Sequence, residues 1–319
     1  MRAPAAMALN RAALMGFAGF LGLLPAPARA DDVARIGDKS VHISLEMVED
    51  AVHPGQDLRV KLTFRGEGEG TATIDAGAFL AERFTVRNAK GTPQKPNSGA
   101  DPMEGLTVVA FDTMERVINL SRSYSRLTKR PGAWEVLWTY GDLRAGPLRI
   151  RVTEPYDPGK DLRAVVETDL GTMTWTLMPA QAPEHVKHFV DLVRQGFYDG
   201  LTIFKATPGL FAVGGDPNGD GTGGWDRLLP PEMSEAIDMQ MGLVGALRQG
   251  TSTTSHCIFF ILLGPNEYMR GKQTFFARVT EGMEVVARLF RVPSTGETNE
   301  ADAYTFLEPV RIRRITIRK

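Results

Sequence analysis

Apolar residues occupy alternate positions in many segments of the first half of the chain. From Val41 to Met47, and again from Trp134 to Tyr140, they alternate with mostly polar neighbours. A side-chain period of two indicates strands that bury one face. Seven segments carry this period or a weaker form of it: residues 40–47, 58–64, 84–86, 106–111, 117–120, 134–140 and 148–152. Such a series of short strands predicts an antiparallel β-sandwich over residues 31–155.

The second half of the chain combines strands with an amphipathic helix. Apolar residues at helical spacing predict a helix from Pro183 to Gln195. Pro183 suits the first helical position, and Gly196 suits the end of the helix. Strands are expected at the other apolar segments: residues 164–168, 172–177, 201–206, 210–213 and 310–317.

The N-terminus has the three parts of a secretory signal peptide. Arg2 and Arg11 precede an apolar run over residues 12–24, and the small-residue sequence Ala28-Arg29-Ala30 follows this run. This order predicts cleavage after Ala30. The apolar run is too short to span a bilayer comfortably, so no membrane insertion is expected after cleavage. We therefore expect a soluble exported protein, either periplasmic or secreted.

A polar, turn-forming segment separates the two halves of the chain. We expect a signal peptide at residues 1–30, a β-sandwich domain at 31–155, a linker at 156–162 and a second domain at 163–319.

The 319 residues are 43% hydrophobic and 24% charged, which is ordinary for a globular protein. The formal net charge of -1 provides no field that would gather nucleic acid, so a nucleic-acid partner is not expected.

Residues that could bind metal or form a disulfide are few. Cys257 is the only cysteine, so we expect it to fill space in the core. His185 and His188 lie three apart on the predicted helix, but no third ligand accompanies them. Asp216 begins a calcium-type loop, yet Arg227 stands at the twelfth position, where such a loop needs glutamate. We therefore expect no metal and no cofactor.

The stretch from Tyr198 to Gly224 is the most informative in the chain. A strand that carries Lys205 ends at the Pro208-Gly209 turn, and a second strand runs into Gly214-Gly215. This order resembles the signature of the cyclophilin-type prolyl isomerases. That signature is a strand with His and Arg, a Pro-Gly turn, a Phe-rich strand ending in Gln, and then Gly-Gly-Asp.

Further segments resemble the same family in the same order. Residues 257–261, Cys-Ile-Phe-Phe-Ile, resemble its Ser-Gln-Phe-Phe-Ile motif, and residues 271–279 and 281–286 resemble the strand and helix that follow. The resemblance covers about residues 164–317. It implies a closed eight-stranded antiparallel β-barrel with flanking helices, and an enzyme that accelerates rotation about X-Pro bonds in protein substrates.

The resemblance also implies which residues form the site. The family's arginine, which donates hydrogen bonds to the prolyl amide nitrogen, falls on Lys205, and we expect Lys205 and Phe260 to act in catalysis. The remaining substrate-binding positions fall on Leu210, Phe211, Val213, Ile258, Tyr268, Met269 and Gln273. Val213 and Ile258 stand where the family has two glutamines, and Gln273 stands where many members have histidine.

These substitutions leave two main hypotheses for the function. The first is an exported peptidyl-prolyl isomerase that assists folding. The second is a catalytically weakened module that binds proline-containing segments without efficient turnover, because Lys205, Val213 and Ile258 replace the family's arginine and glutamines. A third, weaker hypothesis is a structural protein that binds through its sandwich.

The aromatic strand of the first half carries one further resemblance. The order Pro-Gly, aromatic, Val, Trp, Tyr over residues 131–140 is similar to that of immunoglobulin-like modules of exported bacterial proteins. The aromatic stripe is explained either by packing in the sandwich core or by a face that binds a protein partner.

Overall fold

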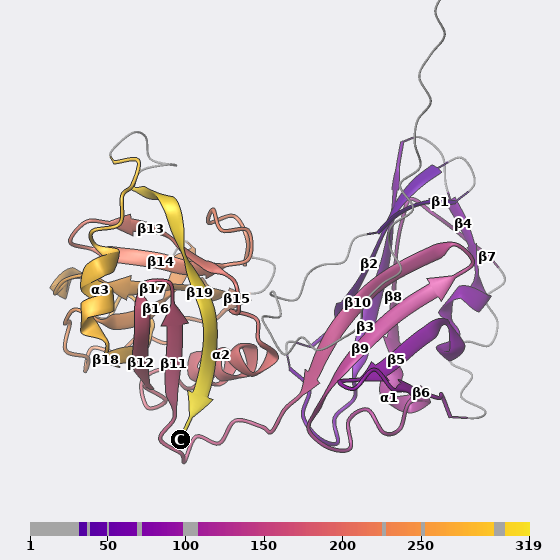
Figure 1. The fold of residues 1–319 in the computed structure, drawn as a ribbon, viewed down its shortest axis with the longest axis horizontal. Helices are drawn as coiled ribbons and strands as arrows, with labels where there is room; N and C mark the ends of the chain where they lie inside the picture. The colour runs from indigo at the N-terminus through magenta and orange to yellow at the C-terminus, as the bar shows by residue number, and fades with distance from the viewer. Residues whose placement is uncertain are drawn as a thin grey trace, which may run out of the picture.

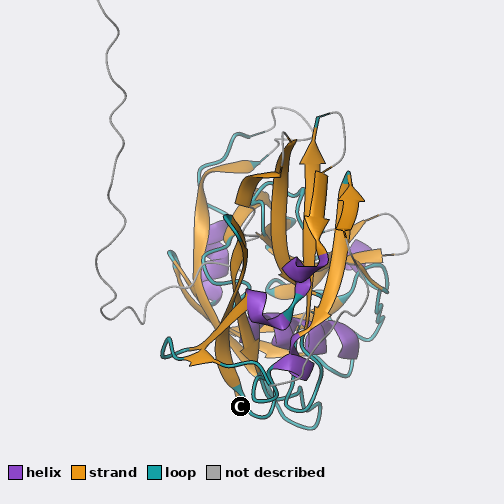
Figure 2. Cartoon of the chain, turned by 90° about the vertical axis from the view of Figure 1, so that its right-hand side faces the viewer, coloured by secondary structure: helices purple, strands orange, loops and turns teal. Residues whose placement is uncertain are grey.

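The computed structural model describes residues 32–36, 39–49, 51–68, 72–97, 108–224, 228–249, 253–296 and 304–319. Two β-rich units lie side by side, and an extended segment after β10 connects them (Figure 1). Strands make up most of the regular structure, with only a few helices (Figure 2). Buried apolar residues form one cluster from Val41 to Val152 and another from Leu162 to Ile315. The expected signal peptide, residues 1–30, lies outside the described residues.

The first unit contains two four-stranded antiparallel sheets and one smaller pair. One sheet has the order β1 (Asp32–Ile36), β2 (Lys39–Met47), β3 (Arg59–Glu67) and β8 (Thr113–Asn119). The other has the order β10 (Leu143–Val152), β9 (Gly132–Tyr140), β5 (Phe84–Asn88) and β6 (Pro93–Gln94). β4 (Ala72–Asp75) pairs with β7 (Val108–Phe111). The predicted sandwich is therefore confirmed.

Aromatic side chains hold the two sheets of this unit together. The ring of Phe64 on β3 meets that of Trp138 on β9 edge-to-face, with centroids 5.5 Å apart. Trp138 is fully buried, and its Nε1 donates a hydrogen bond to the carbonyl oxygen of Ala78, 2.7 Å away. Ala78 lies in the short 3-10 helix η1 (Ala76–Phe79). The aromatic stripe on β9 thus packs in the core at this position, where an indole needs a hydrogen-bond partner.

Strand β10 begins earlier than its sequence pattern predicts. The alternation becomes visible only at Leu148, yet the strand starts at Leu143. The pairing with β9 shifts register between Ala145 and Leu148, and this β-bulge interrupts the period of two. β1, β4 and β6 are the strands of this unit that the pattern did not predict. They are five, four and two residues long, too short to show a clear period.

The second unit is a closed antiparallel barrel. Its sheet has the order β14 (Phe211–Asp216), β13 (Thr202–Thr207), β19 (Thr305–Arg318), β11 (Arg163–Thr168), β12 (Gly171–Leu177), β18 (Phe275–Glu281), β16 (Leu243–Gln249) and β17 (Thr253–Leu262). Pairing of β14 with β17 joins the two ends. The short β15 (Leu228–Leu229) adds to β17. The eight-stranded barrel expected from the resemblance is confirmed.

Strand β19 is longer than expected. It runs from Thr305 through Pro309 to Arg318, whereas the apolar pattern placed its start at residue 310. Its buried positions step from Ile312 to Ile315 because the pairing with β11 skips one residue there. A bulge of this kind lets both isoleucines face the core.

Helices lie against the barrel and in the connections. The predicted helix is confirmed as α2 (Pro183–Gln195), and Gly196 ends it with φ 76°. The other helical segments are η2 (Ala81–Arg83), α1 (Leu120–Ser123), η3 (Glu267–Met269) and α3 (Met283–Leu289). Among the residues that the structure describes, no helix is both long and apolar enough to cross a membrane.

The end of α2 is hydrogen-bonded to the sandwich. Gln195 Oε1 accepts a hydrogen bond from the backbone N–H of Arg151 at 3.1 Å, and Gln195 Nε2 donates to the Arg151 carbonyl at 2.7 Å. The side chain therefore extends β10 as a neighbouring peptide group would. We propose residues 156–162 as the linker between two domains, and this contact docks them.

A histidine and an aspartate form a second contact between the units. His53 Nδ1 lies 2.8 Å from the carbonyl oxygen of Thr153, which can only accept, so this nitrogen carries a hydrogen. Nε2 of the same ring is 3.8 Å from Oδ1 of Asp191 on α2. Burial raises the pKa of the Asp191 carboxyl, and the nearby His53 acts in the opposite direction.

Replacing Gln195 should loosen the junction without unfolding either unit. Gln195→Ala removes the acceptor of the Arg151 amide, and such a hydrogen bond contributes about 1 kcal/mol. We therefore expect the Arg151 amide to exchange its hydrogen roughly fivefold faster, measured by deuterium exchange. Gln181→Ala is the matched control, because the Gln181 side chain makes no hydrogen bond within the described structure. Unchanged exchange at Arg151 would show that the junction does not depend on this contact.

Candidate functional site

Strand pairing places four of the predicted site residues on one face of the barrel wall. Lys205 of β13 pairs with Val213 of β14, and Val213 pairs with Phe260 of β17. Residues directly opposite each other in a sheet point to the same face. Phe211 lies two residues before Val213 and therefore shares this face. The predicted cation and the centre of the predicted apolar pocket are thus brought together.

Phe260 is the centre of an aromatic cluster. Its ring centroid lies 5.7 Å from that of Phe211 and 5.6 Å from that of Phe275. Phe260 is 3% exposed, whereas Phe211 is only partly buried. Gly245, which pairs with Phe260, leaves the space that this ring fills: a Cβ there would lie 2.4 Å from Phe260 Cζ. Phe211, which packs against the buried ring of Phe260, offers an apolar surface of suitable chemistry for a proline ring.

Lys205 lies half-buried beside this apolar surface. Its side chain makes no hydrogen bond or ion pair with any residue that the structure describes. An ammonium group on a flexible stem has three donors that can rotate toward an acceptor, but it lacks the planar fork of a guanidinium. Lys205 can therefore present a positive charge to a bound amide, with less fixed geometry than arginine would give.

The two positions expected to hold glutamine are buried and apolar. Val213 is 5% exposed and Ile258 is 1% exposed. Ile258 lies beneath the glycine-rich loop, where its Cγ1 is 3.1 Å from the position of a Cβ on Gly224. Neither side chain can donate or accept a hydrogen bond. This part of the site therefore cannot orient a peptide backbone by polar contacts of these side chains.

The other predicted positions differ in exposure and in their contacts. Tyr268 is 78% exposed, and Lys272 Nζ lies 3.6 Å from the centre of its ring. Met269, the next residue of η3, packs against the barrel core. Leu210 is 41% exposed in the turn before β14. Gln273 is partly buried, and its Oε1 has no hydrogen-bond partner within the described structure. Within the part of the chain that the structure describes, none of these four side chains makes a hydrogen bond or ring contact with Phe260.

Asp216 organises the glycine-rich loop after β14. Its carboxylate accepts hydrogen bonds from the backbone amides of Asn218 at 3.1 Å and Asp220 at 2.9 Å, and a further one from Gly221. The residue is 1% exposed. Its oxygens are thus occupied by the chain itself, which accounts for the calcium-like spacing of this loop. A Cβ at Gly223 would lie 2.3 Å from Asp216 Oδ1, so the loop needs glycine there.

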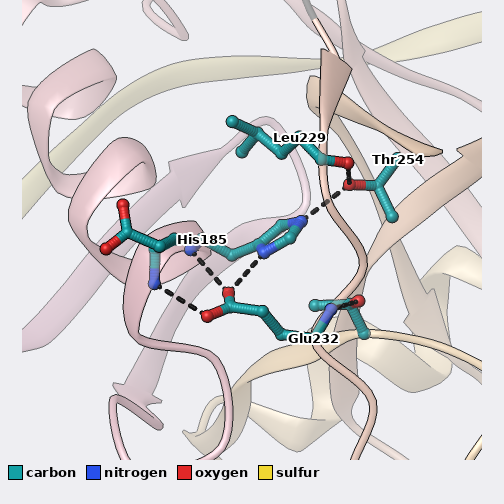
Figure 3. A network of polar contacts seen from close by, with 6 residues as sticks. His185, Leu229, Glu232 and Thr254 are labelled. Atoms are coloured by element: carbon teal, nitrogen blue, oxygen red, sulfur yellow. Dashed lines mark hydrogen bonds and ion pairs between the residues drawn. The ribbon is translucent and has the colours of Figure 1, made fainter. Parts of the chain in front are cut away.

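A buried polar network lies beside the barrel and was not predicted (Figure 3). Glu232 accepts hydrogen bonds from the backbone amides of Glu184 at 3.0 Å and His185 at 2.9 Å, and so caps the first turn of α2. The same carboxylate lies 2.6 Å from His185 Nδ1. His185 Nε2 is 2.7 Å from the hydroxyl of Thr254, which also donates to the Leu229 carbonyl.

A carboxylate, an imidazole and a hydroxyl in this order also form the catalytic triad of many hydrolases. Hydrolysis is excluded here because the groups are buried. Thr254, whose hydroxyl would have to attack the substrate, is 0% exposed, so no substrate can reach it. Burial lowers the pKa of His185, and Glu232 acts in the opposite direction. The network instead connects α2 to β17, the strand that carries Phe260. Sequence reasoning considered His185 only as a metal ligand and missed Glu232 because it is 47 residues away.

His188, the other histidine of α2, belongs to an aromatic contact. Its ring centroid lies 5.5 Å from that of His256. Burial, and secondarily the neighbouring His256, lowers the pKa of His188 to about 3, so the ring is neutral near pH 7. Among the described residues there is no group of three or more His, Cys, Asp or Glu side chains that could hold a metal ion.

A methyl group at Gly245 should disturb the apolar surface from below. Gly245→Ala would place its Cβ 2.4 Å from Phe260 Cζ and 2.8 Å from the Thr274 carbonyl oxygen. Overpacking of this kind costs about 1–3 kcal/mol of unfolding free energy, measured by urea titration. Gly132→Ala is the control, since the nearest atom to its new Cβ is 3.7 Å away. Equal stability of the two variants would contradict the tight contact between Phe260 and Gly245.

Comparison with known proteins identifies the same part of the chain. The family model described as cyclophilin type peptidyl-prolyl cis-trans isomerase/CLD matches residues 163–317. The Neurospora crassa protein named peptidyl-prolyl cis-trans isomerase-like 1 is 32% identical over 139 residues, which are 43% of this chain and 85% of that protein. The Schizosaccharomyces pombe peptidyl-prolyl cis-trans isomerase 9 is 31% identical over 157 residues, 48% of this chain and 25% of that protein.

The share of its own length over which each relative or solved structure matches this chain varies widely. The chain spans about a quarter of the length of the longer curated relatives, of which the Schizosaccharomyces pombe protein is one. The crystal structure of a Cryptosporidium parvum cyclophilin type peptidyl-prolyl cis-trans isomerase is 23% identical with a TM-score of 0.46. It covers 50% of this chain and 99% of its own.

Proposed function

The chain belongs to the cyclophilin-type peptidyl-prolyl cis-trans isomerase family, and on this basis we propose that its barrel accelerates rotation about X-Pro bonds in protein substrates. One observation carries the proposal: the register that sets Lys205 beside Val213 and Val213 beside Phe260. It puts a cation next to an apolar aromatic surface on one face of the barrel. The ligands are proline-containing segments of polypeptide.

The chemistry needs no cofactor. Resonance between nitrogen and carbonyl creates a rotational barrier of about 18–20 kcal/mol in a peptide bond. A donor aimed at the prolyl nitrogen holds the lone pair out of this resonance and favours the twisted amide over both planar forms. The proline ring rests against Phe260 and Phe211, and the ammonium group of Lys205 supplies the donor. No proton transfer or covalent intermediate is involved.

The substituted positions favour modest turnover. A hydrogen bond to a charged group contributes about 1.5–3 kcal/mol, which corresponds to roughly ten- to a hundredfold in rate. Val213 and Ile258 offer no such bonds, and both are buried. This observation supports a second candidate function, a weakened module that binds proline-containing segments without efficient turnover.

Substitution of Lys205 distinguishes these two functions. In a prolyl isomerisation assay, Lys205→Ala should lower kcat/KM by about tenfold or more, because the donor is lost. Lys205→Arg should raise kcat/KM above that of the parent protein, since the guanidinium restores two aligned donors. Lys187→Ala, which removes an exposed lysine from α2, is the matched control and should have no effect.

Isomerisation and peptide binding by the unsubstituted protein show which of the two functions is correct. Acceleration that depends on Lys205 supports the isomerase. Saturable binding of a proline peptide with no acceleration supports the binding module and rejects the isomerase. If no peptide binds at Phe260, both are wrong, and the barrel serves as a structural unit.

We further propose that the protein is exported, on the basis of the three-part pattern in residues 1–30. Expression in a Gram-negative host followed by mass spectrometry of the periplasmic fraction should give a chain that starts at Asp31. A full-length chain that begins at Met1 and stays in the cytoplasm would refute export.

We propose an immunoglobulin-like sandwich that positions the barrel against a protein partner. The buried Trp138 between two antiparallel sheets supports the first part of this proposal. Val117 on β8 is 55% exposed and gives such a partner an apolar contact.

A further inference from the structure

A large cleft lies between the sandwich and the barrel, apart from the face that carries Phe260. Its volume is about 1400 Å³, and both units contribute to its walls. Arg87 and Trp134 line it from the sandwich, Tyr156 from the connecting segment, and Arg314 and Thr316 from β19. Cavities that hold a small molecule usually measure about 300–1,000 Å³, so this cleft has room for a longer ligand.

The cleft is strongly basic although the whole chain is nearly neutral. Eight Arg and Lys side chains line it, against four Asp and Glu side chains, while the formal net charge of the chain is -1. Two of the four carboxylates already face cations: Glu135 lies 3.9 Å from Arg149, and Asp157 lies 2.6 Å from Lys160. An excess of positive charge in a cleft strengthens the local electrostatic field and attracts negatively charged ligands.

Three of the arginines remain available to a ligand. Arg87, Arg314 and Arg318 are exposed and form no ion pair or hydrogen bond with any residue that the structure describes; Arg314 also interacts electrostatically with Asp199. A guanidinium matches a carboxylate with two parallel hydrogen bonds, which makes arginine suited to recognising such groups. The free arginines come from both units, so a ligand that reaches all of them lies across the junction.

The cleft also contains polar atoms that lack partners. Trp134 Nε1, Tyr156 Oη and Thr316 Oγ1 are buried and have no hydrogen-bond partner within the described structure. Burial, with the neighbouring Asp157, raises the pKa of Tyr156, so its hydroxyl keeps its hydrogen and can donate. Buried donors without partners are uncommon in proteins. A bound ligand with acceptor oxygens would satisfy them.

From these features we propose that the cleft binds an acidic peptide segment, in which several carboxylates meet the free arginines and backbone carbonyls accept from Trp134 and Tyr156. The volume of the cleft, its two aromatic donors and its separate guanidiniums fit an extended chain with spaced charges. A single compact anion would reach only one part of it. The site is independent of the isomerase proposal, since it shares none of the residues around Phe260.

Binding by the full chain tests this proposal directly. A fluorescently labelled peptide with several glutamates is titrated with protein, and a peptide with glutamine at those positions is the control ligand. We expect saturable binding of the glutamate peptide and roughly tenfold or more weaker binding of the glutamine peptide. Binding should weaken as salt rises, because the contacts are ionic.

Matched substitutions locate the binding. The double variant Arg87→Gln/Arg314→Gln should lose about tenfold or more in affinity. The control Arg65→Gln/Arg126→Gln removes the same charge from two exposed arginines outside the cleft and should change the affinity by less than about twofold. Thermal melting checks that the variants fold. If the first double variant unfolds, Arg318→Gln takes its place.

Three results would overturn the proposal. Equal affinity for the glutamate and glutamine peptides would show that carboxylates are not recognised. Equal losses in the cleft variant and its control would show a general effect of charge. Binding of tripolyphosphate in the absence of any peptide binding would assign the cleft to a phosphate polyanion.

Discussion

Pairing of β14 with β17 is the interaction on which the second unit depends. It joins the two ends of the eight-stranded sheet, so without it both strands would have open edges. The same pairing sets Val213 opposite Phe260 and brings Phe211 into ring contact with Phe260. Closure of the barrel and assembly of the candidate site are therefore one event. A change that weakens this pairing affects stability and binding together.

Glycines make this closure sterically feasible. At Gly215 a Cβ would lie 2.7 Å from the carbonyl oxygen of Cys257, and φ is 84°. At Gly245 a Cβ would overlap the ring of Phe260. At both positions the absence of a side chain allows neighbouring strands to approach closely. The glycine-rich stretch that stands out in the sequence is thus explained first by packing, and the apolar surface of the site is a consequence of it.

The sequence predicted local features of the fold better than distant ones. The helix from Pro183 to Gln195 was predicted with its correct ends because Pro183 and Gly196 mark them by short-range chemistry. The Lys205 and Val213 pair follows from a hairpin around a Pro-Gly turn, which is also local. The Val213 and Phe260 pair joins residues 47 positions apart, so it could be anticipated only through the family resemblance.

Other features carry no local signal at all. The cap that Glu232 places on α2 replaces the usual side chain at the helix start, where Ala182 offers none. Bulges in β10 and β19 broke the alternation from which strand ends were predicted. The basic cleft combines residues from both units, and the formal net charge of the whole chain, which is near zero, gives no sign of it. These features depend on tertiary contacts that composition and periodicity do not contain.

We expect the face shared by Lys205, Val213 and Phe260 to receive the proline-containing segment. Nuclear magnetic resonance of the full chain, titrated with an alanine-proline peptide, shows which residues the peptide contacts. If this face binds the peptide, the largest shifts should occur at the backbone amides of Val213 and Phe260 and at the Lys205 ammonium group, with little change in the sandwich. Shifts concentrated elsewhere, or none at saturating peptide, would mean that this face does not bind proline.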